Sequence, residues 1–161
     1  MPSGTLDGIL NFDAVKKHLE EHGPECDQED IARLVCDGYR KIFAILVLSG
    51  KEWMVLDFVN NNTNDECLPF TLGKEALTKQ GKRVPYLDNL HFRDEKIFGD
   101  CQWYMLAPYF AKGKNGTVPL RKLHDRTIFP WTRYGEEIES GGYSRVRRVE
   151  IHPKHHNLVC I

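Results

Sequence analysis

The chain has 161 residues, of which 22 are Lys or Arg and 23 are Asp or Glu, so its formal net charge is −1. This length suits one domain, or one domain with an appendage, and eight Phe, six Tyr and three Trp exclude disorder of the whole chain. The near-neutral balance removes overall electrostatic attraction as an argument for binding to nucleic acid or to a membrane surface.

The chain begins with a well-marked helical signal. Asn11 is suited to cap a helix from Phe12 to about His22, because its side chain can accept a hydrogen bond from the first helical turn. Gly23 and Pro24 end this helix, since glycine permits a helix-ending backbone conformation and proline cannot continue the hydrogen-bond ladder.

A second helix follows with a stronger apolar pattern. Asp27 is a good cap, and apolar residues recur at helical spacing between Ile31 and Leu46. Past Tyr39 the apolar residues crowd together, which predicts a helix that is buried on more than one face. Gly50 is expected to end it.

The middle of the chain carries weaker signals. Residues 53–59 read as a third helix, residues 60–65 as a loop by composition, and residues 72–80 as a weak helix. Another helix is expected from Asp94 through Met105. Pro108 then closes or kinks it.

The pattern changes after about residue 117. Residues 127–131 are β-prone and aromatic, and two β segments flank a Gly-Gly pair at Gly141 and Gly142. The sequence therefore predicts a mainly α protein of four to six helices with a short C-terminal β-hairpin. We expect a helical domain over 1–117, and over 118–161 a connector and the hairpin.

The glycine turn resembles a known loop. Residues 138–146 resemble the glycine-rich loop of protein kinases, a β-hairpin that lies over ATP. In this resemblance Gly141 matches the middle glycine, Tyr143 the aromatic at the tip, and Val146 the valine that packs on adenine. The nucleotide-binding residues that the resemblance implies are Gly141, Gly142, Tyr143, Ser144 and Val146.

The chain also departs from that loop at two positions. Glu139 stands where the family has its first glycine, and Ser144 stands where it has its third. A carboxylate and a Cβ atom at Glu139 are unfavourable next to anionic phosphates. Taken alone, a Gly-Gly hairpin turn is more often simply a turn.

Four segments in order extend the resemblance. Residues 39–51, 102–110, 124–131 and 141–156 are similar to the region before and into the kinase domain of filamentous-fungal protein kinase-like proteins. In that family a helical N-terminal region precedes the glycine loop and a full kinase domain. The resemblance thus implies a hairpin equivalent to the first two strands of the smaller kinase lobe.

The catalytic groups of a kinase are not found in this sequence. After the glycine loop there is no third-strand lysine, no His-Arg-Asp loop and no Asp-Phe-Gly metal site, and residues 124–126 hold the types His, Asp and Arg in another order before the loop. Phosphoryl transfer depends on positioning and on charge neutralisation by lysine and magnesium. We therefore expect no catalytic residues in this chain, and ATP with magnesium only if the rest of a kinase is supplied.

Three functions stay open at this level. The leading one is a non-catalytic regulatory or interaction module of a fungal protein kinase-like protein, as a truncated product. The second is a fragment of an active ATP-dependent Ser/Thr protein kinase. The third is an autonomous small fungal protein of unknown role.

The aromatic stretch over residues 102–110 is the candidate interaction surface. The simpler interpretation is that this stretch forms the core of the helical part, because Trp103 falls at an apolar helical position. The sharper hypothesis is that the helix around Trp103 docks against the hairpin or against a protein partner. An isolated hairpin is marginal in water, so we expect it either to pack on this aromatic helix or to be poorly ordered.

Two polar clusters near the C-terminus are expected to be solvent-exposed side chains and not binding sites. His152, His155 and His156, with Cys160 nearby, suggest metal, but adjacent side chains diverge on a strand, so exposed polar residues and no metal site are expected. The basic group lies on one strand, where a solvated face is favoured over phosphate or nucleic-acid binding. Its members are Arg145, Arg147 and Arg148, with Lys154 beyond the strand.

Cysteine usage and hydropathy indicate an intracellular protein, cytoplasmic or nuclear. Five scattered cysteines without a CxxC pair favour reduced thiols, and Cys36 and Cys101 lie in apolar helical patterns as buried, unreactive thiols. The longest apolar run, residues 42–48, is too short to span a membrane. The N-terminus has no basic start followed by an apolar stretch, so no secretory signal is expected.

Overall fold

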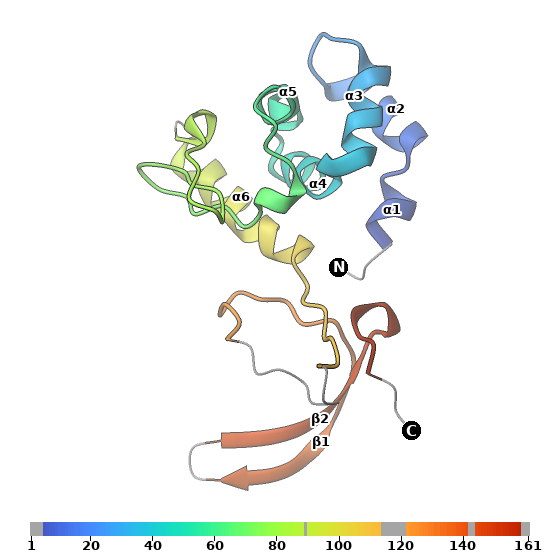
Figure 1. Ribbon diagram of the computed structural model, residues 1–161, viewed down its shortest axis with the longest axis vertical. Helices are drawn as coiled ribbons and strands as arrows, with labels where there is room; N and C mark the ends of the chain where they lie inside the picture. The colour runs from blue at the N-terminus through green and yellow to red at the C-terminus, as the bar shows by residue number, and fades with distance from the viewer. Residues whose placement is uncertain (1–4, 89, 114–121, 142–143, 159–161) are drawn as a thin grey trace.

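The structure is a computed structural model that describes residues 5–88, 90–113, 122–141 and 144–158. Helices make up one end of the molecule, and a β-hairpin extends from the other (Figure 1). This confirms the predicted mainly α fold with a short C-terminal hairpin.

The first helices form as their local signals predict. A short α1 (Thr5–Ile9) precedes α2 (Phe12–His22), and the Ala14 N–H donates to the Asn11 side chain at 3.0 Å, which confirms the cap. Gly23 allows a close approach, because a Cβ atom there would lie 2.6 Å from the Leu19 carbonyl oxygen. The helix ends where the predicted Gly-Pro signal stands.

The main core helix is interrupted in its middle. The path runs through α3 (Gln28–Leu34), a π-helical turn (Val35–Tyr39) and α4 (Arg40–Ser49), and Gly50 ends it with φ 64°. The buried stretch of α4 is Ile42, Phe43, Ala44, Ile45 and Leu46. Consecutive buried residues on a helix face every direction, so the expectation of burial on more than one face is confirmed.

The region that follows α4 is mostly irregular. A 3-10 turn (Glu52–Met54) leads into α5 (Val55–Asn60), as the sequence predicts for residues 53–59. Two further 3-10 turns follow, Asp65–Cys67 and Pro85–Leu87.

The weak helix predicted over 72–80 is wrong. Thr71 and Leu77 exchange backbone hydrogen bonds at 2.8 and 2.9 Å, and Leu77 also bridges to Arg83. Gly73, with φ 146°, provides a backbone conformation that a helix does not contain. Pairing between these extended pieces therefore prevails over a weak helical propensity.

The longest helix, α6 (Phe92–Met105), packs against α4. It starts slightly earlier than predicted, because the His91 ring accepts the Arg93 N–H at 3.4 Å and so caps it. Phe98 stacks on Phe58 with ring centroids 6.3 Å apart and contacts Phe70 at 6.0 Å. This aromatic group joins α6, α5 and the irregular region into one core.

The hairpin consists of β1 (Trp131–Gly141) and β2 (Ser144–Ile151), paired antiparallel. Its base is attached to the chain just beyond α6: the Phe110 N–H donates to the His155 carbonyl at 2.8 Å, and the Phe110 ring stacks on Trp131 at 5.6 Å. The predicted packing on the aromatic stretch is thus made by its last residue rather than by the helix itself.

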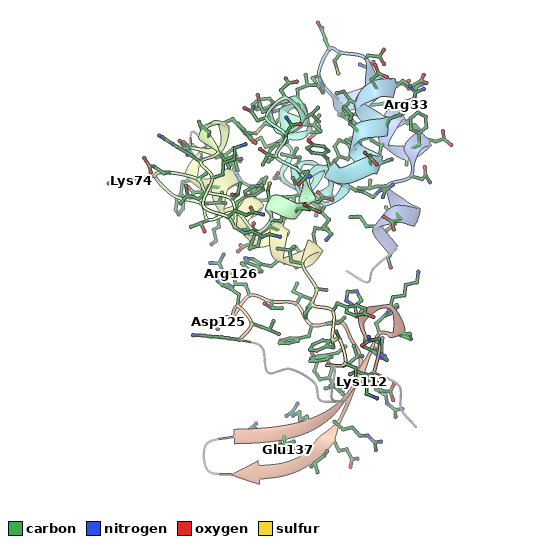
Figure 2. All side chains as sticks on the ribbon, viewed as in Figure 1. Arg33, Lys74, Lys112, Asp125, Arg126 and Glu137 are labelled. Atoms are coloured by element: carbon green, nitrogen blue, oxygen red, sulfur yellow. The ribbon has the colours of Figure 1, made fainter. Side chains whose placement is uncertain are left out.

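Besides the contacts of Phe110, two contacts of α6 cross the predicted boundary at residue 117. Arg126 pairs with Asp100 of α6 at 2.9 Å, and His124 stacks on Trp103 at 4.2 Å. Figure 2 places Arg126 close beneath the helical part. The division into 1–117 and 118–161 stays a prediction. In the part of the chain described here, no helix combines the length and the apolar character that a bilayer span requires.

Candidate functional site

Of the residues predicted to bind nucleotide, Gly141, Ser144 and Val146 belong to the paired strands of the hairpin. Gly141 pairs with Ser144 in the antiparallel register, while Gly142 and Tyr143 lie outside the described residues. Val146 pairs with Glu139, and half of its side chain is exposed (50 %). Among the described residues the sheet has two strands, so no neighbouring strand covers Val146, and nucleotide binding by this turn stays a prediction.

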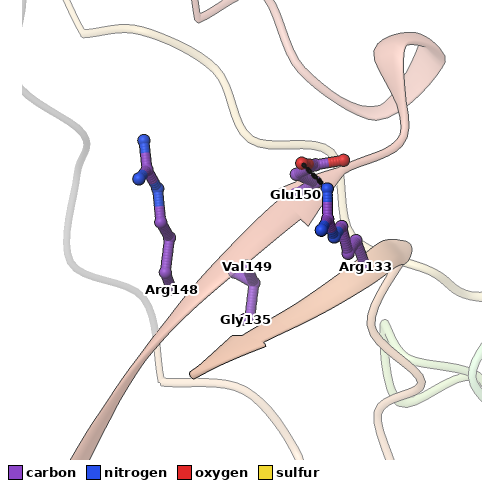
Figure 3. Close-up of a pocket in the computed structure, with 5 residues that line it drawn as sticks. All are labelled: Arg133, Gly135, Arg148, Val149 and Glu150. Atoms are coloured by element: carbon purple, nitrogen blue, oxygen red, sulfur yellow. Dashed lines mark ion pairs between the residues drawn. The ribbon is translucent and has the colours of Figure 1, made fainter. Parts of the chain in front are cut away.

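A small cavity of about 210 Å³ lies on the hairpin, nearer its base. Figure 3 shows Arg133 and Glu150 side by side in it, joined by an ion pair of 3.7 Å, with Arg148 directed away from them. Gly135 sits directly against the other strand, because a Cβ atom there would lie 3.0 Å from the Arg148 carbonyl oxygen. Of the predicted nucleotide residues, Val146 does not line this cavity.

A larger groove of about 620 Å³ runs along α6, and we call it the α6 groove. Three separate segments form it: residues 69–72, one face of α6, and residues 124 and 126. Its apolar and aromatic lining includes Phe70, Leu72, Phe92 and Trp103.

The first wall is held by a buried amide. The Phe70 N–H donates to Oε1 of Gln102 at 2.8 Å, and Nε2 of Gln102 donates to the Phe70 carbonyl at 3.0 Å. Gln102 is only 3 % exposed, so both backbone groups are satisfied away from water. At the base of the wall, a Cβ atom on Gly99 would lie 3.3 Å from Cδ1 of Leu72, which shows how closely the segment lies on α6.

The opposite wall is built from the connector that precedes the hairpin. The ring planes of Trp103 and His124 differ by 7°, and their centroids lie 4.2 Å apart. The ion pair between Arg126 and Asp100 holds the same connector to α6. The ring of Trp103 is thereby fixed beside the groove.

The rim combines an exposed aromatic ring with charged groups. Phe92, the first residue of α6, is 79 % exposed, an unusually high fraction for phenylalanine. Lys96 lines the groove and forms no ion pair with any residue in the described ranges. This arrangement is suited to hold an apolar or aromatic side chain, with polar contacts at the edge.

Trp103, and Gln102 in the same aromatic stretch, are groove residues that the sequence indicates as an interaction surface. Phe92 and Leu72 carry no sequence signal for a site, because a lone apolar residue at a helix start or in a loop is common. Only the contact between residues 69–72 and α6 brings them together.

The C-terminal histidines have local roles. His155 is 4 % exposed, with Nδ1 2.9 Å from the Pro108 carbonyl oxygen, so the expectation of an exposed side chain is wrong for this residue. The rings of His152 and His156 each accept a nearby backbone N–H. In residues 5–88, 90–113, 122–141 and 144–158, no group of three His, Cys, Asp or Glu side chains is arranged to hold a metal ion. Cys160 lies outside the described residues.

The two singled-out cysteines differ in burial. Cys101 is buried on α6, and burial raises the pKa of its thiol. Cys36 is half-buried, with Sγ 3.9 Å from the Leu10 carbonyl oxygen, so the expectation of a buried thiol is wrong for this residue. A raised pKa favours the protonated form of the Cys101 thiol, and its lack of reactivity stays a prediction.

Comparisons of the chain with protein-family models, with curated proteins and with solved structures gave no match.

Proposed function

We propose that this chain is a non-catalytic interaction module that docks a protein partner in the α6 groove. The observation that carries the proposal is the exposed Phe92 ring at the rim of a groove that Trp103 also lines. Large aromatic side chains are enriched where proteins bind each other, and exposing them to water without a partner is unfavourable.

The size and construction of the groove support this role. About 620 Å³ lies within the range of sites that bind ligands or anchor side chains. Gln102 and the stack of Trp103 on His124 hold the walls in place before anything binds, so little order has to be created on binding.

We propose further that the module serves the regulatory front end of a fungal protein kinase-like protein in the cytoplasm or nucleus. The support is the ordered resemblance of residues 39–156 and the glycine turn at Gly141. In this proposal ATP and magnesium bind near the turn only when the remainder of a kinase fold is supplied, since a lone hairpin does not neutralise phosphate charge.

An affinity capture experiment tests the docking site. The purified chain is immobilised and exposed to a lysate of its source cells, and the retained proteins are quantified for wild type, Phe92→Ser and Leu48→Ser. Leu48 is 56 % exposed and does not line the groove, so it serves as an exposed, apolar control on another helix.

We expect proteins that wild type and Leu48→Ser retain equally and that Phe92→Ser loses. Both substitutions remove exposed side chains, so their helical circular dichroism should equal that of wild type. Equal retention by Phe92→Ser would contradict docking in the groove.

A further inference from the structure

We propose that the outer edge of β2 accepts an extended, acidic segment of a partner protein as a third strand. This goes beyond the proposed function, because the edge of β2 and the α6 groove are separate surfaces with different lining residues. The argument rests on the register of the hairpin and on the distribution of its charges.

All the irregularity of the hairpin lies in β1. The register shifts fall between Trp131 and Arg133, between Tyr134 and Glu137, and between Glu137 and Glu139, and each inserts an extra residue on the β1 side. β1 accordingly has 11 residues where β2 has 8. Bulges bend and twist a strand and interrupt its ladder, so the outer edge of β1 is poorly suited to pair with another strand.

The β2 strand is regular from Ser144 to Ile151. Within the described residues β1 is its one partner, so the backbone groups on its outer edge pair with no other strand. A regular strand with one free edge is the structure on which a further strand forms main-chain hydrogen bonds.

The charges of β2 identify its occupant as acidic. The strand has three arginines and one glutamate, a formal net charge of +2, and Arg145 and Arg148 form no ion pair with any residue whose side chain the structure describes. Arg147 pairs with Glu137 across the hairpin at 3.5 Å. An added strand with carboxylates beside Arg145 and Arg148 would gain pairings that the free hairpin lacks.

The same charges disfavour a second copy of this chain as the occupant. Pairing of β2 with another β2 would set arginines beside arginines, and like charges across a strand pair are destabilising. The β1 edge has a net charge of −2 but carries the three bulges. An acidic segment of another protein can pair with the regular edge of β2 and neutralise its arginines at the same time.

The alternation of β2 sets a pattern for the partner. Arg145 and Arg147 share one face, while Val146 and Arg148 share the other, because successive side chains point to opposite faces. Val146 is 50 % exposed and offers an apolar contact on the same face as Arg148. We therefore expect an extended segment that mixes acidic and β-branched residues.

Fluorescence anisotropy with short labelled peptides tests this assignment. The probe is an acetylated, amidated eight-residue peptide in which pairs of glutamates alternate with pairs of valines, so that each face of the added strand carries both residue types. Two matched peptides serve as controls: one with lysine for each glutamate, and one with glutamate kept but with N-methyl groups on alternate backbone nitrogens. The N-methylated peptide keeps the charge and loses strand pairing.

We expect saturable binding of the glutamate peptide below about 1 mM at low salt, and much weaker binding of both controls. The amides of β2 should gain protection from hydrogen exchange when the peptide binds. Arg145→Gln and Arg148→Gln should each weaken binding by about two- to five-fold, and Glu136→Gln on β1 should not weaken it.

Three outcomes would overturn the assignment. One is no saturable binding of the glutamate peptide, another is equal binding of the N-methylated peptide, and the third is protection on α6 in place of β2. Phe92→Ser should bind the peptide as wild type does, so failure here and failure of the groove proposal are distinguishable.

Discussion

The Asp65 carboxylate caps the N-terminus of α4 by accepting the backbone N–H of Ile42 at 2.9 Å. Its second oxygen accepts the Lys41 N–H, also at 2.9 Å. The cap is needed because the π-helical turn ends at Tyr39 with φ −123° and ψ 15°, which leaves the first N–H groups of α4 without helical partners. A side chain from far along the chain thus completes the main core helix.

This cap predicts a pH-dependent contribution to stability. Burial raises the pKa of the Asp65 carboxyl above its ordinary value of about 3.9, and the two N–H donors offset part of that rise. The folded state holds the proton more tightly, so this contribution is complete below about pH 3.9 and is lost as the pH rises through the folded pKa. Asp65→Asn removes the titrating group.

The measurement is the free energy of unfolding in urea for wild type and Asp65→Asn from about pH 3 to pH 7. The advantage of wild type over the variant should shrink as the pH rises through this range. An advantage that grows with pH would show that folding favours the ionised carboxylate instead.

The Gln102 clamp predicts a large effect of removing one side chain. Gln102→Ala leaves the Phe70 N–H and carbonyl buried without partners, so the free energy of unfolding should fall by about 1–3 kcal/mol or more. Gln80→Ala is the matched control, because Gln80 is exposed and makes one hydrogen bond of 3.2 Å to the Glu66 carbonyl. Equal losses for both variants, measured by urea unfolding, would argue against the clamp.

The close contact at Gly135 predicts a local effect in the hairpin. In Gly135→Ala the new Cβ atom would lie 3.0 Å from the Arg148 carbonyl oxygen, so strands β1 and β2 must shift apart. Hydrogen exchange of the hairpin amides should speed up while the helical amides stay unchanged. Gly8→Ala in α1 meets nothing within 4 Å, so it should leave hairpin exchange as in wild type.

Nucleotide affinity is the direct test of the glycine turn. Because Val146 is half exposed and no further described strand lies beside the hairpin, we expect no saturable binding of a fluorescent ATP analogue with magnesium below the millimolar range, about −4 kcal/mol. Titration by anisotropy measures this, and Val146→Ser should change nothing. Micromolar affinity in wild type that Val146→Ser weakens would show that this turn binds nucleotide unaided.

The sequence alone was sufficient to predict the elements whose signals lie in neighbouring residues. Asn11, Asp27 and Gly50 mark the ends of their helices through contacts with immediate neighbours, and the structure places each cap as predicted. Continuous apolar character in α4 predicts burial without knowledge of its surroundings. The hairpin follows in the same way from β propensity on both sides of the Gly-Gly pair.

Tertiary structure alone decided the features that depend on residues far apart. Phe70 and Gln102 lie 32 positions apart, and the hydrogen bonds between them build one wall of the α6 groove. They also hold the backbone at Phe70 in an extended conformation, directly before residues 72–80, where the predicted helix is wrong. The bulges of β1 likewise depend on its register with β2. Local propensities for helix or strand differ by only about 1 kcal/mol per residue. A buried hydrogen bond or a packed side chain outweighs that difference. Long-range contacts therefore determine the α6 groove, the bulged edge of β1 and the free edge of β2.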